Sequence, residues 1–264
     1  MARMESPITG VAAGVPFTAL PPSVEGVAPL IVTWHMLDAP RSDAAFAAAL
    51  PMHGLPAWRV HLGMPMCGAR MVDGTMDAGM ELVRKDPLMA YLHPFVEQAV
   101  GEFPAALASI RSQLAVDSGP IGVLGGSLGG AVALRVLAET SVPVFAGAVV
   151  NAAIRMRSVV DLFPGDYPYD SESSQAVDSL DFLAKADALA ARAPLLVVSG
   201  ELDHPGLRAD AEALVAATGA SFLSIPGLAH PLADEPGIEP SPQWATTRSV
   251  DDGLTAWFRQ QLAG

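Results

Sequence analysis

Short apolar runs alternate with longer amphipathic stretches along most of the chain. The runs are rich in β-branched residues, which is typical of strands buried on both faces of a sheet. They are PLIVTWH (29–35), AWRVHLGMP (57–65), PIGVLGG (120–126), PVFAGAVVN (143–151), APLLVVSGELD (193–203) and SFLSIPGLAH (221–230). The stretches between them have helical periodicity and predict helices over residues 41–50, 88–114, 127–139, 178–193, 209–219 and 244–262.

Other segments lack a clear period. Residues 6–28 are rich in Pro, Gly and Val, and predict a loose, irregular amino-terminal segment with one short strand at residues 15–19. Residues 67–90 are predicted to be irregular. Residues 152–192 are predicted to begin with a polar loop that contains FPGDYPYDSESS, followed by the helix at 178–193.

The alternation of strands and helices predicts the α/β class. In this class parallel strands are joined by right-handed helical crossovers, and helices cover both faces of the sheet. We therefore expect a doubly wound, mostly parallel sheet. No linker separates two such patterns, so residues 1–264 are expected to form a single domain. The insertion at residues 152–192 is too short for a second domain and is predicted to be a small lid or cap.

Composition narrows the class of partner. The chain is 51% hydrophobic and 16% charged, which is enough apolar material for a sizeable core. No apolar run reaches the ~18 residues of a membrane span, and MARMESPITG does not resemble a secretory signal. The net charge of −13 argues against nucleic acid, because phosphates would be repelled. Cys67 is the only cysteine, which excludes an internal disulfide and fits a cytoplasmic location.

The sequence GGSLG at residues 125–129 joins a predicted strand to a predicted helix. It fits G-x-S-x-G, a strand–turn–helix in which the serine has a strained backbone and an exposed hydroxyl. A side chain at either outer glycine would collide with the neighbouring strand and helix. Ligands of such sheets bind beyond the carboxyl ends of the strands, where Ser127 is expected. Ser127 is therefore the candidate nucleophile. The alternative is a glycine-rich turn in which the serine only caps the helix.

A serine hydroxyl is a weak nucleophile unless a base accepts its proton and an acid orients that base. With this strand–turn–helix the acid and then the histidine follow the serine along the chain. His230, in the loop after the last predicted strand, is the candidate base, and His204 is the alternative. Asp203, just beyond the preceding strand, is the candidate acid, and Glu201 is the alternative.

Acyl transfer also requires two N–H groups that bind the oxyanion of the tetrahedral intermediate. One would be the backbone N–H of Leu128. The other is expected after the strand at 29–35, from Met36 or Leu37. Trp34 and His35 are expected to line the site beside this second donor and to contact the substrate. His35 has a second interpretation, as another base or a metal ligand.

Methionines crowd the segment after the strand at 57–65, and methionine adapts well to irregular apolar surfaces. Met66 is expected to contact the substrate, and the group as a whole either lines an acyl pocket or fills the core: Met64, Met66, Met71, Met76 and Met80. Aspartates are scattered rather than ordered as in a metal-binding loop: Asp73, Asp77, Asp161, Asp166 and Asp170. We therefore expect no metal ion and no cofactor.

Three motifs carry a family resemblance. GGSLG (125–129), GELD (200–203) and PGLAH (226–230) resemble, in order and spacing, motifs of the α/β-hydrolase superfamily, over roughly residues 29–262. The resemblance implies an eight-stranded, mostly parallel sheet and a Ser-Asp-His triad at Ser127, Asp203 and His230. One position departs from the family pattern, because the usual His-Gly after the oxyanion strand is His35-Met36 here.

A serine nucleophile implies an acyl-enzyme, and hence acyl transfer to water. We expect a serine hydrolase that cleaves small to medium carboxylic esters, with a small-molecule ester as its ligand. The short insertion at 152–192 argues against an interfacial lipase with a large lid. A thioesterase or a peptidase that uses the same triad is one alternative. A non-catalytic ligand receptor with this fold is the other.

Overall fold

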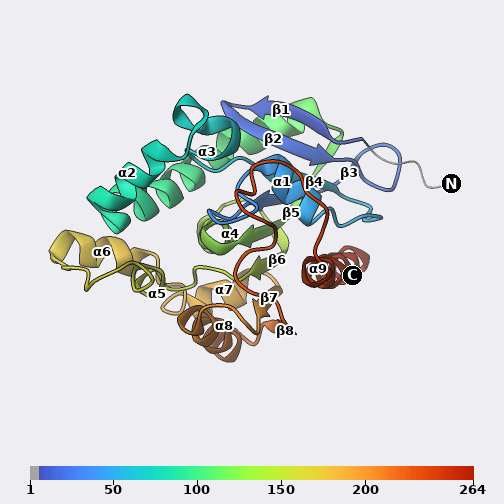
Figure 1. Cartoon of the computed structure of the whole chain (residues 1–264). Helices are drawn as coiled ribbons and strands as arrows, with labels where there is room; N and C mark the ends of the chain where they lie inside the picture. Colours follow the sequence, from blue (N-terminus) through green and yellow to red (C-terminus); the bar gives the residue numbers. More distant parts are fainter. Residues whose placement is uncertain (1–5) are drawn as a thin grey trace.

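The computed structural model describes residues 6–264, which contain one eight-stranded sheet of strand order β1-β2-β4-β3-β5-β6-β7-β8 (Figure 1). The strands are β1 (Ile8–Ala12), β2 (Val15–Leu20), β3 (Ala28–Trp34), β4 (Trp58–Leu62), β5 (Val116–Gly126), β6 (Val144–Val150), β7 (Leu195–Gly200) and β8 (Ser221–Ile225). The pairs β1–β2 and β2–β4 are antiparallel, and all the other pairs are parallel. The predicted α/β class and mostly parallel sheet of about eight strands are confirmed.

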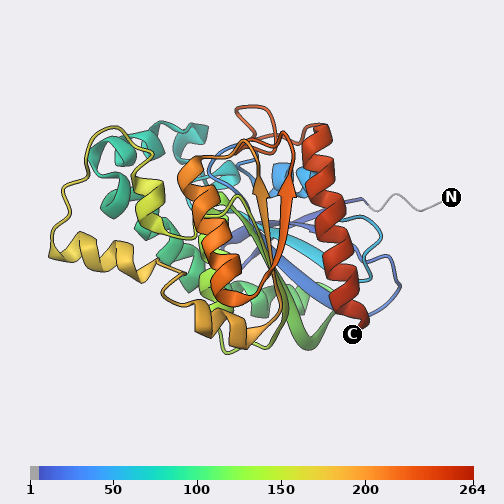
Figure 2. The same cartoon turned by 90° about the horizontal axis from the view of Figure 1, so that it is seen from below.

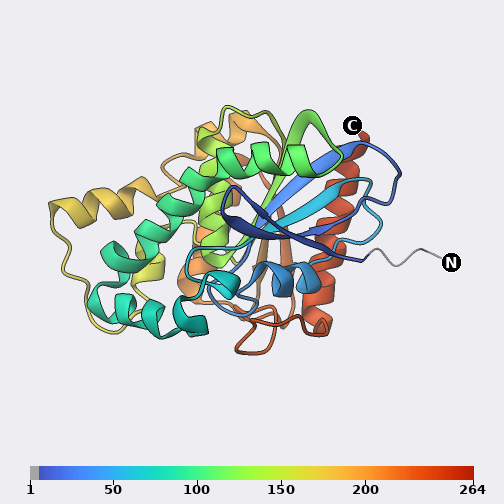
Figure 3. The same ribbon diagram turned by 90° about the horizontal axis from the view of Figure 1, so that it is seen from above.

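Helices cover both faces of the sheet, as a doubly wound architecture requires (Figures 2 and 3). The helices are α1 (Asp43–Ala49), α2 (Asp77–Lys85), α3 (His93–Gln113), α4 (Ser127–Glu139), α5 (Met156–Val160), α6 (Ser171–Ser179), α7 (Ala186–Arg192), α8 (Pro205–Thr218) and α9 (Ala245–Ala263). Short 3-10 turns lie at Gly68–Arg70 and Val72–Gly74, and a π-helical turn lies at Pro87–Leu92. Within residues 6–264 no helix combines the length and apolar character that crossing a membrane requires.

Successive strand residues point to opposite faces and so build two separate cores. In β7, Val197 belongs to the larger apolar cluster, which packs under α3, α4, α7 and α8. The next residue, Val198, belongs to the smaller cluster under α1 and α9, together with Phe46 and Phe258. Burial on both faces explains why the parallel strands are continuous apolar runs rather than alternating patterns.

The helices α2, α5 and α6 lie on the side of the molecule away from α9 (Figures 2 and 3). The first of them belongs to the connection between β4 and α3, and the other two to the connection between β6 and α7. The two connections meet, because α6 contacts the π-helical turn before α3. The predicted insertion at residues 152–192 therefore lies against the connection between β4 and α3.

The amino-terminal region differs from its prediction as a loose, irregular segment. The strand expected at residues 15–19 is β2, and β1 pairs with it in a tight antiparallel hairpin. The two turn residues, Ala13 and Gly14, have φ angles of 50° and 90°. Two-residue hairpins require positive φ at these positions, which Asn-Gly usually supplies. Because Ala13 stands where Asn, Asp or Gly is usual, the sequence does not predict this hairpin.

The prediction of an irregular segment at residues 67–90 is wrong for its second half, which contains α2 and the start of the π-helical turn. The apolar residues Met76, Met80 and Val83 recur at helical spacing, although no residue of α2 is fully buried. The charges at its ends also favour it: Asp77 lies in the first turn, and Arg84 and Lys85 lie in the last. This arrangement complements the helix dipole.

The single helix expected at residues 178–193 is divided. The helix α6 ends at Ser179, and α7 begins only at Ala186. The side chain of Asp181 accepts hydrogen bonds from the backbone N–H groups of Leu183 and Ala184. Such local bonds from a short acidic side chain offer the backbone a turn in place of a helix.

Candidate active site

Ser127 begins α4 directly after β5, at the carboxyl end of the central strand. Its φ angle is 48°, in the left-handed region where residues other than glycine are strained. A Cβ on Gly125 would lie 2.0 Å from the carbonyl oxygen of Gly129, and a Cβ on Gly129 would lie 2.3 Å from that of Trp34. Glycine is therefore required at both positions. The close packing of α4 against β3 and β5 holds the strained turn in place.

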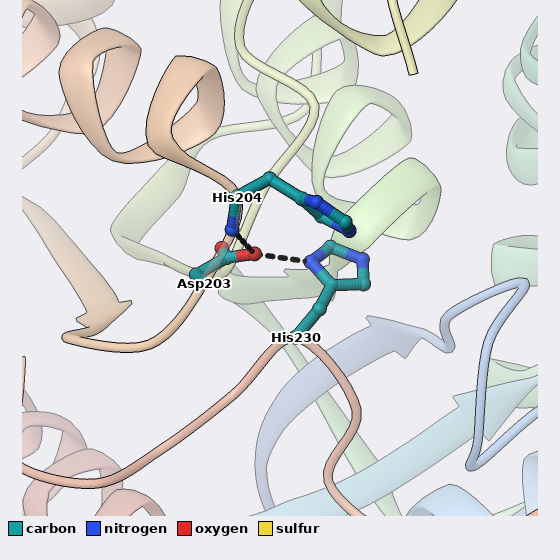
Figure 4. Close-up of side chains that lie close together, drawn as sticks. All are labelled: Asp203, His204 and His230. Carbon is teal, nitrogen blue, oxygen red and sulfur yellow. Dashed lines mark hydrogen bonds and ion pairs between the residues drawn. The ribbon is translucent and has the colours of Figure 1, made fainter. Parts of the chain in front are cut away.

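Two loops at the same edge of the sheet bring an imidazole and a carboxylate to Ser127. His230 lies between β8 and α9, and its Nε2 is 2.9 Å from the Oγ of Ser127. The other ring nitrogen, Nδ1, is 2.7 Å from Oδ1 of Asp203, in the turn after β7 (Figure 4). When Nδ1–H donates to the carboxylate, the lone pair of Nε2 faces the serine hydroxyl. Both side chains are buried, so little water competes for these bonds.

Asn151 links the loop of His230 to the turn of Asp203, and no motif in the sequence singles it out. It follows β6 directly and is 2% exposed. Its Nδ2 donates to the carbonyl oxygens of Ala229 (2.9 Å) and His230 (3.0 Å), and its Oδ1 accepts from the N–H of Gly200 (2.8 Å). One amide thus fixes both the loop of the histidine and the turn of the acid. The available signal was a polar residue at the end of the apolar run PVFAGAVVN.

Asp38 is a second side chain that the sequence analysis missed. Its Oδ2 lies 3.3 Å from Nε2 of His230, the same nitrogen that faces Ser127. About half of this side chain, 52%, is exposed, whereas only 1% of the side chain of Asp203 is. The imidazole therefore has one buried carboxylate on Nδ1 and one solvated carboxylate beside Nε2.

These carboxylates set the charge of the histidine. Burial acts to lower the pKa of His230, but the hydrogen bonds and charges of Asp203 and Asp38 outweigh it and raise the pKa to about 9. Burial likewise acts to raise the pKa of Asp38, and the hydrogen bond and charge of His230, with the charge of Arg41, lower it below its ordinary value. The site favours an imidazolium between two carboxylates when no substrate is bound.

The candidate oxyanion donors flank the serine. Leu128 lies in the first turn of α4, where N–H groups have no partner within the helix. Both Leu128 and Leu37 line the cavity that Ser127 opens into. Met36 does not line it. Its side chain is buried beneath Gly126, within the cluster under α1 and α9.

Trp34 and Met66, which were expected to contact substrate, do not line this cavity. Trp34 is 1% exposed and packs edge-on against Phe103, with ring centroids 5.4 Å apart. Met66 is half-buried against the same apolar cluster. Both side chains pack against the larger apolar cluster, to which Phe103 of α3 also belongs, and not at the cavity.

His35, also expected at the substrate, is wholly buried and does not line the cavity. Its Nδ1–H donates to the carbonyl oxygen of Met36 (2.6 Å), and its Nε2 accepts from the N–H of Met64 (2.9 Å). Burial lowers the pKa of His35 to about 4, which keeps the ring neutral. The ring links the loop after β3 to the loop after β4, and both of its nitrogens are already used.

The alternatives for base and acid occupy other positions. The ring of His204 lies beside that of His230, with centroids 5.3 Å apart (Figure 4), but the hydroxyl of Ser127 bonds to His230. Glu201 is exposed, and it is Asp203 that bonds to His230. Among the described residues, Asp203, His204 and His230 have possible metal-ligand atoms within 4.8 Å of one another. A cation bound by either ring nitrogen of His230 would displace one of the two bonds of that ring, to Asp203 or to Ser127.

The hydroxyl of Ser127 opens into a cavity of about 370 Å³. Apolar side chains from both connections at this end of the sheet form most of its wall: Leu37, Met76, Met80, Val83, Tyr91, Leu92, Leu128, Ala153, Val159, Leu162, Phe163 and Leu207. Its polar groups are Ser127, His230, His204, Asp38 and Arg41. Of the five methionines singled out in the sequence, Met76 and Met80 line this cavity. A larger, more open hollow of about 700 Å³ also has Phe163 in its wall, and none of Ser127, Asp203 and His230 lines it.

No protein-family model matches the sequence, and no curated protein sequence matches it. The structure is similar to that of TT1662 from Thermus thermophilus, with a TM-score of 0.69 and 18% identity over 99% of this chain and 100% of the other. It is also similar to a puromycin-hydrolyzing peptidase of Mycobacterium tuberculosis, with a TM-score of 0.68 and 17% identity. That match covers 99% of this chain and 40% of the peptidase. The esterase domain of a Rhodothermus marinus protein matches with a TM-score of 0.61 and 16% identity, over 98% of this chain and 99% of the other.

Proposed function

We propose that this protein, which has the α/β-hydrolase fold, is a serine hydrolase that cleaves carboxylic esters through an acyl-enzyme on Ser127. The observation that carries the proposal is the pair of bonds from Ser127 Oγ through His230 to Asp203, at 2.9 and 2.7 Å. These bonds lie at an apolar cavity, and the serine is held in the strained turn that exposes a nucleophile. Hydrolases among the structures that the chain resembles lend further support.

In the proposed reaction Nε2 of His230 accepts the proton of the Ser127 hydroxyl while Oγ attacks the ester carbonyl. The carbonyl electrons move onto oxygen and form the tetrahedral oxyanion. The bond to the leaving oxygen then breaks, and that oxygen takes the proton from Nε2. Water repeats the sequence on the acyl-enzyme and releases the acid. Asp203 holds the ring in the required tautomer throughout and stabilises the imidazolium.

The N–H groups of Leu128 and Leu37 are the proposed oxyanion donors. Both residues line the cavity beside Ser127, whereas the side chain of Met36 is buried away from it. Leu128 adds the positive end of the α4 dipole. Removal of one such donor typically lowers kcat by about 10²–10³-fold.

The cavity favours a small to medium apolar acyl group, because its wall is mostly Leu, Val, Met and Phe and its volume is about 370 Å³. The insertion at residues 152–192 is proposed to act as a cap over it. It shares this role with residues 76–92, since Met76 and Met80 line the same cavity as Val159 and Phe163. A single domain with a cap built from two connections is thus our proposed organisation.

Hydrolysis of p-nitrophenyl esters, with acyl chains from acetyl to dodecanoyl, tests the proposal. Ser127→Ala is expected to lower kcat by about 10⁴–10⁶-fold, because the triad acts as a unit. Ser112→Ala, at an exposed serine in α3, is the matched control and is expected to keep full activity. Acyl thioesters and aminoacyl amides, measured alongside, distinguish an esterase from a thioesterase or a peptidase. Saturable binding of esters without turnover would contradict the proposal and favour a receptor.

A further inference from the structure

We propose that Asp38 selects the leaving group of the substrate: it favours esters whose alcohol carries a positive charge and disfavours those whose leaving group is anionic. The inference rests on the proposed function and names the substrate class of the same site. Asp38 Oδ2 lies 3.3 Å from Nε2 of His230, at the nitrogen that faces Ser127 Oγ at 2.9 Å.

The position of the leaving group follows from the chemistry at this nitrogen. In the second half of acylation, Nε2–H donates its proton to the leaving oxygen, so that oxygen must come within hydrogen-bond reach of Nε2. The Asp38 carboxylate is already within 3.3 Å of the same atom. The alcohol part of the ester therefore lies against Asp38, while the acyl part fills the apolar cavity. Asp38 is thus a specificity-determining residue for the alcohol.

The charge of Asp38 loses its nearest cationic partner during the reaction. Among the residues that the structure describes, its one ion pair is with His230, which gives up its added proton when it acts as acid. Arg41 lines the same cavity and its charge also acts on Asp38, but its guanidinium forms its salt bridge with Glu235. His204 and Tyr91 are the remaining titratable groups of the lining. A cationic alcohol would supply the missing partner.

The expected size of the effect is modest. About half of the Asp38 side chain is exposed, so water and salt screen its charge. A unit charge about 5 Å away, at an effective dielectric constant between those of the protein surface and water, changes kcat/KM by about three- to tenfold. Polyanionic leaving groups such as coenzyme A would be repelled, and the net charge of −13 adds to that repulsion. The thioesterase alternative is therefore disfavoured for acyl-coenzyme A.

Two esters of the same acid test the inference: hexanoylcholine and 3,3-dimethylbutyl hexanoate. Their alcohols have the same shape and differ in a quaternary nitrogen against a carbon. The quantity measured is the ratio of their kcat/KM values, so that any common effect of a substitution on His230 cancels. Asp38→Asn is expected to lower the choline-to-dimethylbutyl ratio by about three- to tenfold. In 1 M salt, where the screening length falls to about 3 Å, most of the difference between native and variant is expected to disappear.

Asp252→Asn, at an exposed position of α9 away from the cavity, is the matched control and is expected to leave the ratio unchanged. An unchanged ratio in Asp38→Asn would overturn the inference, even if both esters react more slowly, because Asp38 would then act only through His230. If the native chain hydrolyses neither these esters nor the p-nitrophenyl series, the proposed function itself fails and the inference fails with it.

Discussion

The side-chain amide of Asn151 donates a hydrogen bond of 3.0 Å to the carbonyl oxygen of His230, the residue whose ring faces Ser127. The Oδ1 atom of the same amide accepts a hydrogen bond from the N–H of Gly200, which lies just before the turn that contains Asp203. The proposed base and acid thus lie on loops that a single buried side chain at the end of β6 joins. Precise placement of catalytic groups accounts for large factors in rate, so this link is expected to matter for turnover.

Asn151→Gly tests that link. The native residue has a φ of 46°, which glycine adopts without strain, so the substitution removes the amide and leaves the backbone conformation accessible. We expect the free energy of unfolding to fall by about 2–4 kcal/mol, because three buried backbone groups lose their partner. We also expect kcat to fall by about 10–100-fold. Urea unfolding and ester hydrolysis measure the two effects. An unchanged kcat would mean that the loops hold their positions without Asn151.

Gly129→Ala tests the packing of α4 behind the proposed nucleophile, Ser127. The added Cβ would lie 2.3 and 2.4 Å from the carbonyl oxygens of Trp34 and His35, so α4 must move away from β3. We expect loss of activity and a fall in stability of several times the ~1 kcal/mol that separates glycine from alanine in an open helix. Gly101→Ala is the control, because a Cβ there meets nothing within 4 Å. It is expected to stabilise α3 by about 0.5–1 kcal/mol.

The charge on His230 predicts the pH dependence of turnover. The ring must be neutral to accept the serine proton, and its pKa is raised to about 9. We therefore expect kcat/KM for a neutral ester to rise from pH 7, to reach half of its maximum near pH 9, and to level off above about pH 10. Asp38→Asn removes one of the carboxylates that raise this pKa, so the rising limb should move to lower pH. A limb that stays in place, as is expected for Asp252→Asn, would show that Asp38 does not influence the imidazole.

Stability is predicted to change in the opposite direction over the same range. The folded pKa of His230, about 9, exceeds the ordinary value of 6.5. The protonated ring therefore stabilises the fold fully below pH 6.5, and this contribution is lost as the pH rises through 9. The difference is on the order of 3 kcal/mol. Urea unfolding of the native chain and of His230→Gln at pH 6 and pH 9.5 measures it. Equal losses in the two proteins would contradict the raised pKa.

The sequence contained the information for those parts of the fold and site that depend on local pattern. Continuous apolar runs located six strands, and the order of GGSLG, GELD and PGLAH located the three side chains that the structure brings together. Motifs of this kind are local, since the turn after β5 needs its glycines whatever the rest of the chain does. The β1–β2 hairpin escaped detection because Ala13 adopts a φ that Asn or Gly usually supplies.

Roles that depend on how distant loops meet could not be predicted in this way. Asn151 and Asp38 are unremarkable in the sequence, and they become significant only because the loops after β6, β3 and β8 converge. His35 shows the converse. Its position after a strand suggested substrate contact, but both of its nitrogens bond to backbone in a fully buried environment. The burial of His35 depends on how distant loops pack, and the local sequence around it does not predict that packing.

The central claim is that Ser127 is an activated nucleophile. The most direct measurement is the intact mass of the native chain and of Ser127→Ala after incubation with a small fluorophosphonate. Attack by Oγ on phosphorus expels fluoride and leaves one phosphonyl group on the serine. We predict a single adduct on the native chain and none on the variant, because activation requires the base at 2.9 Å from Oγ. A folded native chain that gains no adduct, or a variant that gains the same one, would contradict the account.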